Sequence, residues 1–596
     1  MYNRKVYEVA AGAVPFLLKK YYHTKVDPKM GKGTRNRNVR AEDKVNAPSK
    51  HVQKQDKAVK YGTWALSAFA ILLVVSLVFI GLTTAGVFMR TSTAAESDDF
   101  EIDGAMMSYF IHSVYSSHVQ QYEEYVSSYL SSSNISAYTL MGIDPNVSLK
   151  KQVKDKTTGE TWFQYYAEQA VEQVSEIMVY CQAAKAAGVE LDEDDLSSID
   201  SEIMMLDLYA QLYGYSLNSY IGSMYGAGVR EKDVRRAMEM SALASKFAEQ
   251  IQEGFYDAST DEKVQAFFDK NKNDYINADY LTYVFTAKKD STEKDADKAT
   301  ADYEALKIKI AEYAEALESK ESAEEFKAYV KERWIADNEE TYRDKHYETY
   351  LKDVKKENED LTEDEAKAKA EEKLAEKLDE DADAQIETLL TEDYAYTVSS
   401  DLGKWIFGEG DTAAAVVNTT KKIVNDSKDK DGTYTITVYF LVRAASKNED
   451  TTRTFSYMMM TSDKFKEEEA KAALEMFKKG EINKDALKEL AESETYKSKA
   501  GFNTLEDFKE GAFGADEMDE WLYADERAKG DYTLITYTID KTTYYLIVVV
   551  DEIGAEEWYV DTRDGMVADE VETWYEEQSK TYAVTINQKA LNKVRM

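Results

Sequence analysis

Residues 543–550 read TYYLIVVV, and this run decides how the C-terminal part of the 596-residue chain folds. It consists almost entirely of aromatic and β-branched residues, which favour β-strands. A second run of the same kind, YTLITYT at 532–538, ends just before Asp540-Lys541, and these two residues suit a tight turn. The two runs therefore predict an antiparallel hairpin.

The hairpin closes a larger strand–helix–strand unit that begins at Thr454. Residues 455–460, FSYMMM, predict its first strand, and Lys464–Ser493 predicts a helix. Residues 278–445 follow a similar order, in which a first strand is followed by helices and then by a closing hairpin. The elements predicted there are a strand at 280–285, long charged helices over 292–392, strands at 403–407 and 434–442, and a turn at 428–432. We interpret 278–445 and 452–553 as a degenerate repeat.

Residues 160–256 predict a series of helices. Apolar residues recur at helical spacing in WFQYYAEQAVEQVSEIMVYCQAAKAA (162–187), and Gly188 is positioned to end that helix. The acidic run Asp192–Asp194 suits the start of the next helix, because a helix N-terminus carries partial positive charge. Gly214 and Gly226 are natural stops for the helices that follow.

Residues 64–89 read WALSAFAILLVVSLVFIGLTTAGVFM and contain no charged residue. Because ~20 apolar residues suffice to cross the ~30 Å hydrocarbon core, this segment predicts a transmembrane helix. Residues 1–60 hold 15 Lys/Arg against 5 Asp/Glu, which places the N-terminus in the cytoplasm under the positive-inside rule. The bulk of the chain is then expected outside the cytoplasmic membrane.

Charge and cysteine content exclude several classes of function. Residues 91–596 hold 58 Lys/Arg against 107 Asp/Glu, a net charge of −49, which makes them a poor binder of nucleic acid. Cys181, the one cysteine, precludes an internal disulfide and lies in an apolar helical run, where buried packing is expected. The sequence shows no Cys–His pair, zinc-ligand spacing or phosphate-binding glycine loop, so we predict no catalytic residue, metal or cofactor.

The stretch 160–275 resembles the N-terminal chaperone domain of the SurA and PrsA extracytoplasmic foldases. The matching residues, in order, are Gly188, Leu191, Gly214, Tyr225-Gly226, Val229, Asp233-Val234, Phe267-Phe268, Asn271 and Tyr275.

The two repeats resemble parvulin-type peptidyl-prolyl isomerase domains. The family's first and last strands each carry a His before apolar residues. Here these positions are Tyr283 and Tyr439 in the first repeat, and Tyr457 and Tyr545 in the second. The family's Gly-Gly-x-Leu-Gly-Trp/Phe loop resembles residues 399–407, SSDLGKWIF, and only Lys499–Phe502, KAGF, remains of it in the second repeat.

The resemblance implies a foldase that binds unfolded or secreted polypeptides. All four His positions carry tyrosine, so we expect a scaffold with little or no isomerase activity. An active prolyl isomerase is one alternative, since a tyrosine hydroxyl can both donate and accept a hydrogen bond. A structural or adhesive surface protein that uses the fold as a spacer is another, and a long charged insertion at 335–392 favours it.

Aromatic surface is the candidate for holding such polypeptides, because Tyr and Trp combine a flat apolar body with a polar tip. Core packing is the competing interpretation for each residue. The candidates in the repeats are Tyr283, Trp405, Phe407, Tyr439, Tyr457, Phe502, Trp521 and Tyr545, and those in the helical stretch are Tyr213, Tyr215, Tyr220 and Tyr225.

The predicted fold class is multidomain α+β, with a single N-terminal transmembrane helix, a helical SurA-like domain and two parvulin-like α/β domains. The predicted parts are a basic cytoplasmic tail (1–60), the transmembrane helix (64–89), a helix and linker (91–155), the helical chaperone-like domain (156–276), the two repeats (278–445 and 452–553) and a C-terminal helix and tail (554–596).

Overall fold

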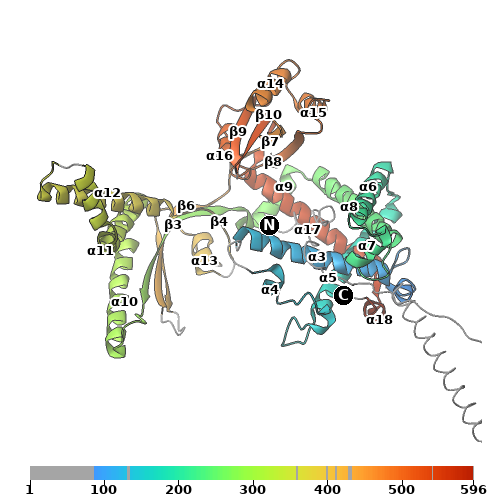
Figure 1. Ribbon diagram of the computed structural model, residues 1–596, viewed down its shortest axis with the longest axis horizontal. Coiled ribbons are helices and arrows are strands. Elements are labelled where there is room, and N and C mark those ends of the chain that lie inside the picture. The colour runs from blue at the N-terminus through green and yellow to red at the C-terminus, as the bar shows by residue number, and fades with distance from the viewer. Residues whose placement is uncertain are drawn as a thin grey trace, which may run out of the picture. The chain divides into compact units, whose positions relative to one another are not determined.

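The computed structural model describes residues 86–129, 135–357, 360–397, 400–409, 412–426, 433–539, 541–594 and 596. The chain divides into two compact units (Figure 1). One comprises the residues up to Ala258 together with Val567–Met596, and the other comprises Ser259–Met566.

The first unit is mainly helical. Its helices are α2 (Val87–Arg90), α3 (Gly104–Tyr129), α4 (Ala137–Met141), η1 (Leu149–Lys151), α5 (Trp162–Ala187), α6 (Glu193–Leu212), α7 (Leu217–Met224), α8 (Glu231–Asp257), the C-terminal part of α17 (Glu557–Thr581) and α18 (Gln588–Leu591). The helix predicted over 162–187 is confirmed. Thr161 and Gln164 form a capping box at its start, and Gly188 ends it with a φ of 75°. Asp192 caps α6, as the acidic run indicated.

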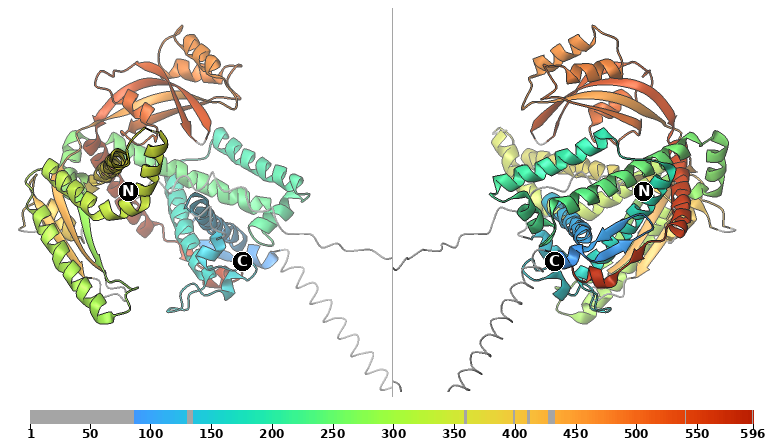
Figure 2. Two further views of the ribbon diagram at one scale, coloured as in Figure 1. Left: turned by 60° about the vertical axis from the view of Figure 1, so that its left-hand side comes forward. Right: turned by 90° about the vertical axis from the view of Figure 1, so that its right-hand side faces the viewer.

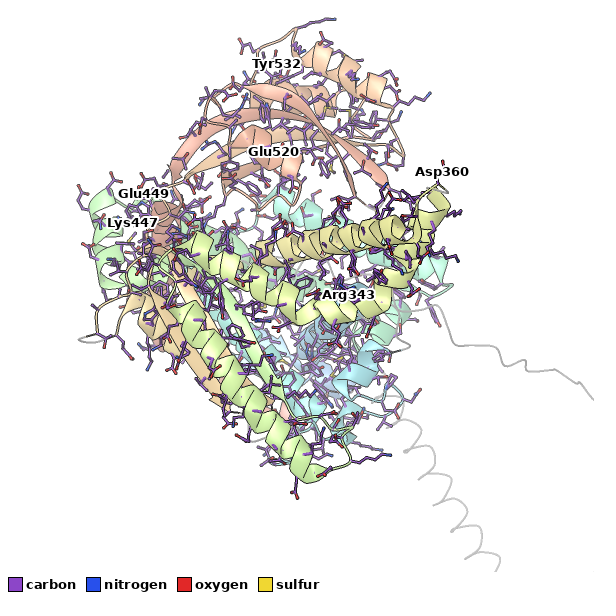
Figure 3. The ribbon with its side chains drawn as sticks, turned by 90° about the vertical axis from the view of Figure 1, so that its left-hand side faces the viewer. Arg343, Asp360, Lys447, Glu449, Glu520 and Tyr532 are labelled. Carbon is purple, nitrogen blue, oxygen red and sulfur yellow. The ribbon has the colours of Figure 1, made fainter. Side chains whose placement is uncertain are left out.

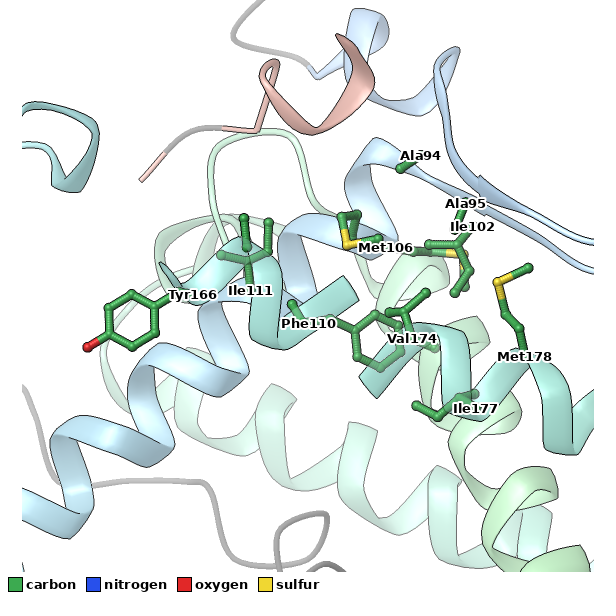
Figure 4. Close-up of a cluster of buried hydrophobic side chains, with 14 of the residues drawn as sticks. Ala94, Ala95, Ile102, Met106, Phe110, Ile111, Tyr166, Val174, Ile177 and Met178 are labelled. Atoms are coloured by element: carbon green, nitrogen blue, oxygen red, sulfur yellow. The ribbon is translucent and has the colours of Figure 1, made fainter. Parts of the chain in front are cut away.

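The core of this unit lies where α3, α5 and α8 meet (Figure 4). Met106 and Phe110 of α3 and Val174 and Met178 of α5 are fully or almost fully buried there. A three-stranded antiparallel sheet, in the order β11-β1-β2, joins the two ends of the unit. Its strands are β1 (Thr93–Glu96), β2 (Glu101–Asp103) and β11 (Thr585–Ile586), none of which the periodicity predicted.

The second unit contains two four-stranded antiparallel sheets. The first, in the order β4-β3-β6-β5, is built from β3 (Asn277–Lys288), β4 (Leu390–Ala395), β5 (Thr420–Asp426) and β6 (Thr433–Ser446). The second, in the order β8-β7-β10-β9, is built from β7 (Thr451–Thr461), β8 (Gly501–Phe508), β9 (Tyr532–Ile539) and β10 (Thr542–Glu556). In both sheets the first and last strands of the repeat pair at the centre, and the second and third strands form the edges.

Helices cover both faces of each sheet, and the covering helices occur at the same points of the chain. In the first repeat, one face is covered by α10 (Ala296–Glu318), α11 (Ala323–Glu357) and α12 (Glu363–Glu387). The short α13 (Asp401–Phe407) lies on the other face. Two further helices, α9 (Asp261–Lys270) and η2 (Lys272–Tyr275), precede the sheet in the sequence. In the second repeat, α14 (Glu467–Phe477) and α15 (Lys484–Glu492) cover one face, and the short α16 (Asp516–Leu522) lies on the other (Figure 2).

Helices α11 and α12 form an antiparallel hairpin, with Asp360 at the turn (Figure 3). The α11 side of their contact is a stripe of mostly aromatic residues spaced by four, which includes Trp334, Tyr342 and His346. The facing α12 stripe, also spaced by four, is small or branched and buried: Ala366, Ala370, Leu374, Leu378 and Ala382. Large residues on one helix therefore meet small ones on the other, which lets the two helices pack closely.

The predicted fold class, which included a transmembrane helix, is wrong and is corrected by the structure. The described chain is a multidomain α+β protein with three small antiparallel sheets. Among the described residues, none of the helices is both long enough and apolar enough to cross a membrane.

The C-terminal end of the segment predicted to cross the membrane belongs to the folded unit. There Met89 is buried with Ala105 and Tyr220, and the Arg90 guanidinium donates a hydrogen bond to the Gly228 carbonyl (2.7 Å). The rest of that segment, residues 64–85, lies outside the described residues, as does the turn predicted at 428–432.

Two predictions of secondary structure are also wrong. Residues 403–407 form most of helix α13 rather than a strand, because the Ser400 hydroxyl caps the helix and Leu402 and Ile406, one turn apart, are buried on the same side. The single helix expected over Lys464–Ser493 is two helices, and Asn483 caps the second. The strands predicted at 280–285, 434–442, 455–460, 532–538 and 543–550 are confirmed.

Candidate functional site

The register of the first sheet separates the two tyrosines that occupy the family's His positions. Tyr439 of β6 lies opposite Thr282 of β3, and Tyr283 lies opposite Val438. Residues directly opposite each other project to the same face of a sheet, and successive residues alternate between faces. Tyr283 and Tyr439 therefore project from opposite faces.

The second sheet has the same arrangement. Tyr457 of β7 lies opposite Val548, whereas Tyr545 of β10 lies opposite Met460. Tyr457 packs with the α16 face and Tyr545 with the α14/α15 face. In neither repeat do the two tyrosines meet across a pocket, so they form no hydrogen-bonded pair that could act on a bound peptide.

The eight aromatic residues predicted to bind substrate divide between these faces. Five lie on the faces that carry the short helices: Trp405, Phe407 and Tyr439 with α13, and Tyr457 and Trp521 with α16. Tyr283 packs beneath the α10–α12 side of the first sheet, and Phe502 and Tyr545 pack beneath α14 and α15. These last three contribute to packed cores rather than to a binding surface.

On the first sheet, the α13 face holds a compact aromatic cluster. The Tyr280 ring centroid lies 5.4 Å from that of Tyr439 and 5.3 Å from that of Tyr394, and Phe407 contacts Tyr394 and Tyr396. Burial of these side chains raises the pKa of Tyr280 and of Tyr439. Both hydroxyls are therefore neutral hydrogen-bonding groups at ordinary pH.

On the second sheet, the α16 face presents a more open aromatic surface. Phe513 makes edge contacts with Tyr457 (5.9 Å between ring centroids) and with Tyr537 (6.1 Å), and Tyr537 stacks on Tyr544 at 5.2 Å. All four rings are half-buried. The Asn503 amide donates to the Tyr457 hydroxyl at 3.4 Å. We define the second-sheet aromatic face by Tyr457, Phe513, Tyr537 and Tyr544.

Sequence reasoning identified one member of this face and missed three. Tyr537 and Tyr544 lie opposite each other across the β9–β10 hairpin, so the hairpin register was the signal that could have found them. Phe513 lies in the loop between β8 and α16, where no periodicity marks it.

Helix α6 exposes an apolar stripe that is the largest departure from an ordinary surface in the first unit. Met204, Leu208 and Leu212, each one turn apart, are 69%, 59% and 73% exposed, and Met205 beside them is 49% exposed. The opposite side of the same helix is buried through Ile199, Ile203, Leu206 and Ala210. We call Met204, Met205, Leu208 and Leu212 the α6 stripe.

The tyrosines predicted in the helical stretch fall into two groups. Tyr213 and Tyr215, which follow α6 in the sequence, are exposed, whereas Tyr220 and Tyr225 are buried in the core. Tyr213 stacks on Tyr220 with 6.2 Å between ring centroids. The stripe itself was missed, because α6 is apolar on both sides and the pattern alone does not say which side is covered.

The titratable groups most often used in catalysis are placed as structural residues. Among the described residues, no three or more His, Cys, Asp or Glu side chains are grouped so that they could hold a metal ion. Cys181 is fully buried, as expected, and burial raises the pKa of its thiol to about 12. Burial lowers the pKa of His112 and of His118, and His118 lies 2.9 Å from the Tyr166 hydroxyl.

No model of a known protein family matches this chain, and no curated protein matches its sequence.

Proposed function

We propose that this protein is an extracytoplasmic holdase, which binds unfolded polypeptides through exposed apolar and aromatic surface and keeps them from aggregating. The α6 stripe carries the proposal. Four adjacent large apolar side chains at the exposures given above cost solubility unless they serve as an interaction surface. Two of the four are methionines, whose flexible thioethers adapt to clients of many shapes.

The second-sheet aromatic face supports the same function. Its half-buried rings offer flat apolar surface, and the three tyrosines add hydroxyl tips, which suits contact with polypeptide of varied sequence. The net charge of −49 over residues 91–596 keeps such a protein soluble despite its exposed apolar side chains. Residues 1–60 are basic whereas residues 91–596 are acidic, and this difference in charge supports a location of residues 91–596 outside the cytoplasm.

The placement of the tyrosines favours a holdase over a prolyl isomerase. Isomerisation must cross a barrier of ~18–20 kcal/mol, and a catalyst does so by binding the twisted amide more tightly than the planar one. Polar groups that converge on one bound amide would be needed, and Tyr457 and Tyr545 project to opposite faces. A prolyl-peptide isomerisation assay that finds activity, lost on Tyr457→Ala, would favour the isomerase instead.

Suppression of aggregation tests the proposal. Full-length protein is added to a chemically unfolded reporter that aggregates on dilution, and light scattering is followed. We expect suppression by the wild type and its loss in Met204→Ser/Leu208→Ser/Leu212→Ser, with an unchanged unfolding midpoint because the three side chains are exposed.

The matched control is Ile308→Ser/Val416→Ser/Met476→Ser, which removes three exposed apolar side chains from other parts of the surface. We expect this variant to suppress aggregation as the wild type does. Equal suppression by the stripe variant and the wild type would contradict a role for α6, and no suppression by the wild type would contradict the holdase function itself.

A further inference from the structure

The second unit has an open groove that none of the surfaces above includes. One wall is a single stripe of helix α9, and the other is formed by the end of β10 and the first residues of α17. The groove has a volume of about 810 Å³. The α9 residues that line it run from Asp261 to Asp269, ~12 Å at 1.5 Å per residue, which matches roughly four residues of extended chain.

Carboxylates dominate the polar part of the lining. They come from Asp261, Glu262 and Asp269 on α9 and from Glu556 on the facing wall. Within the described part of the chain, none of these four carboxylates forms an ion pair. Three of them accept hydrogen bonds from neutral side chains of the groove: Asp261 from the Tyr559 hydroxyl on the facing wall (2.8 Å), Glu556 from the Trp558 indole on its own wall, and Asp269 from the Gln265 amide on α9 (2.8 Å).

Aromatic surface supplies the rest of the opposite wall. Trp558 and Tyr559 both line the groove, and their rings contact each other edge to face at 5.9 Å between centroids. The Trp558 ring already binds an ammonium group, because the Lys447 Nζ atom lies 3.2 Å from its centroid. A cation over an indole face is stabilised by the ring quadrupole, and by more when water is partly excluded.

From this combination we infer that the groove binds extended polypeptide segments that carry lysine or arginine. The unneutralised carboxylates attract a cationic side chain, Trp558 and Tyr559 hold its aliphatic stem, and the same charges repel nucleic acid and anionic lipid. The inference rests on the proposed function, and it names a class of client segment that the apolar α6 stripe does not select.

Peptide binding by the full-length protein tests the inference. The probes are two fluorescein-labelled 12-residue peptides of Gly and Ser, one with four Arg and Lys residues and one with Gln at those positions, and Kd is measured by fluorescence anisotropy. Neither peptide has an apolar side chain, so neither depends on the α6 stripe. We expect the cationic peptide to bind at least tenfold more tightly, with affinity falling as salt screens the attraction.

The groove variant is Asp261→Asn/Glu262→Gln/Asp269→Asn, which keeps the size of each side chain and the acceptor for Tyr559. We expect it to bind the cationic peptide about tenfold more weakly, or ~1.4 kcal/mol. The control Glu340→Gln/Glu372→Gln/Glu376→Gln removes three exposed carboxylates from the α11–α12 hairpin and should bind within twofold of the wild type. Wild-type affinity in the groove variant, or equal binding of the two peptides, would overturn the inference.

The two proposals fail separately. If the wild type does not suppress aggregation yet prefers the cationic peptide through Asp261 and its neighbours, the holdase function is wrong and the groove assignment stands. If the groove variant suppresses aggregation of an apolar reporter but binds both peptides as the wild type does, the holdase function stands and the groove assignment is wrong.

Discussion

Asp393 and Asp507 occupy the same position in the two sheets of the second unit and share a left-handed backbone, with φ of 51° and 46°. Each is the second of two residues that bulge opposite one residue of the first strand, Asp279 for Asp393 and Thr454 for Asp507. In both bulges the backbone N–H of the aspartate donates to the side chain of that opposite residue.

An arginine completes each bulge. The Arg443 guanidinium donates to the Asp393 carboxylate and the Arg563 guanidinium to the Asp507 carboxylate, both at 2.8 Å. Both aspartates therefore pair with an arginine, but Arg443 comes from β6 and Arg563 comes from α17. The repeated bulge extends the similarity of the two repeats from strand order to a single backbone conformation.

The bulges predict an unusual order of stability among substitutions at position 507. Asp507→Ala loses the Arg563 ion pair. Alanine also has no polar side chain that could stabilise the positive φ through a local hydrogen bond, so we expect the free energy of unfolding to fall by ~1–2 kcal/mol. Asp507→Gly loses the same ion pair but adopts this φ freely, and should be ~1 kcal/mol more stable than the Ala variant. Urea denaturation of both variants checks the order, and an Ala variant as stable as the Gly variant would mean that the bulge carries no strain.

At Gly403, inside helix α13, we expect a Gly→Ala change to lower the stability of the fold. Alanine is favoured over glycine in helices by about 1 kcal/mol, yet a Cβ at position 403 would lie 2.6 Å from the Thr397 carbonyl oxygen. We therefore expect Gly403→Ala to lower stability by ~1–3 kcal/mol, through displacement of the residues that lead into α13. Differential scanning calorimetry should show a lower unfolding temperature.

Gly254→Ala in α8 is the control for Gly403→Ala. Gly254 is exposed in the helix interior, and a Cβ there would meet nothing within 4 Å. This variant should gain ~0.5–1 kcal/mol. If both variants shift stability in the same direction, close contact with Thr397 does not govern the first.

Glu557 predicts that stability falls as pH rises. The residue is 9% exposed, and burial raises the pKa of its carboxyl from 4.5 to about 7, with Asp561, Asp450 and Asp393 adding to the rise and Lys509 opposing it. Between these two pKa values the folded chain holds a proton that the unfolded chain has lost. This group therefore destabilises the fold progressively as pH rises from about 4.5 to about 7, by ~1–3 kcal/mol in all.

Glu557→Gln should remove this pH dependence while it preserves an acceptor for the Asn448 amide, which donates to Glu557 at 3.0 Å. The free energy of unfolding is measured in urea at pH 5 and pH 8 for the wild type, for Glu557→Gln and for the exposed Glu552→Gln. We expect a smaller difference between the two pH values only in Glu557→Gln. If Glu557→Gln shows the same difference in unfolding free energy between pH 5 and pH 8 as the wild type, the Glu557 carboxyl has the same pKa in the folded and the unfolded chain.

The parts of the fold that the sequence predicted are those with one dominant local signal. The strand Thr543–Val550 and the helix ended by Gly188 carry unbroken β-branched or helical patterns, and both are present. Residues 403–407 were wrongly predicted as a strand, because their helix depends on the Ser400 cap and on burial of Leu402 and Ile406 against a sheet that is distant in sequence. The small sheet of the first unit was not predicted, because its strands β1 and β11 lie at opposite ends of the described chain.

The candidate site was predictable in residue type but not in residue position. Aromatic enrichment predicted aromatic surface, and the two faces that carry α13 and α16 are aromatic. Register decides which tyrosine reaches which face, and a shift of one residue moves every side chain to the other side. The α6 stripe depends on which of the apolar residues of that helix are covered by the rest of the unit, and this tertiary packing is not contained in the local pattern.

The α11–α12 hairpin predicts that most of the charged insertion can be removed without unfolding the first sheet. Phe326 and Val330 at the start of α11 are buried in the core of that sheet, whereas the hairpin beyond them packs largely on itself. The two helices are close where they would be cut, because Lys331 forms ion pairs with Asp379 (2.9 Å) and Asp383 (2.5 Å). Replacement of residues 335–381 by a short Gly/Ser linker should therefore preserve the fold.

The same deletion separates a holdase from a spacer protein. The α6 stripe and the second-sheet aromatic face lie outside residues 335–381, so a holdase should suppress aggregation as well with the hairpin as without it. Circular dichroism establishes that the remaining fold is intact, and the light-scattering assay compares the deletion with the wild type. Because a spacer depends on its reach, full suppression by the deletion variant supports the holdase, and a loss of suppression in a folded deletion variant would place the binding surface on the hairpin instead.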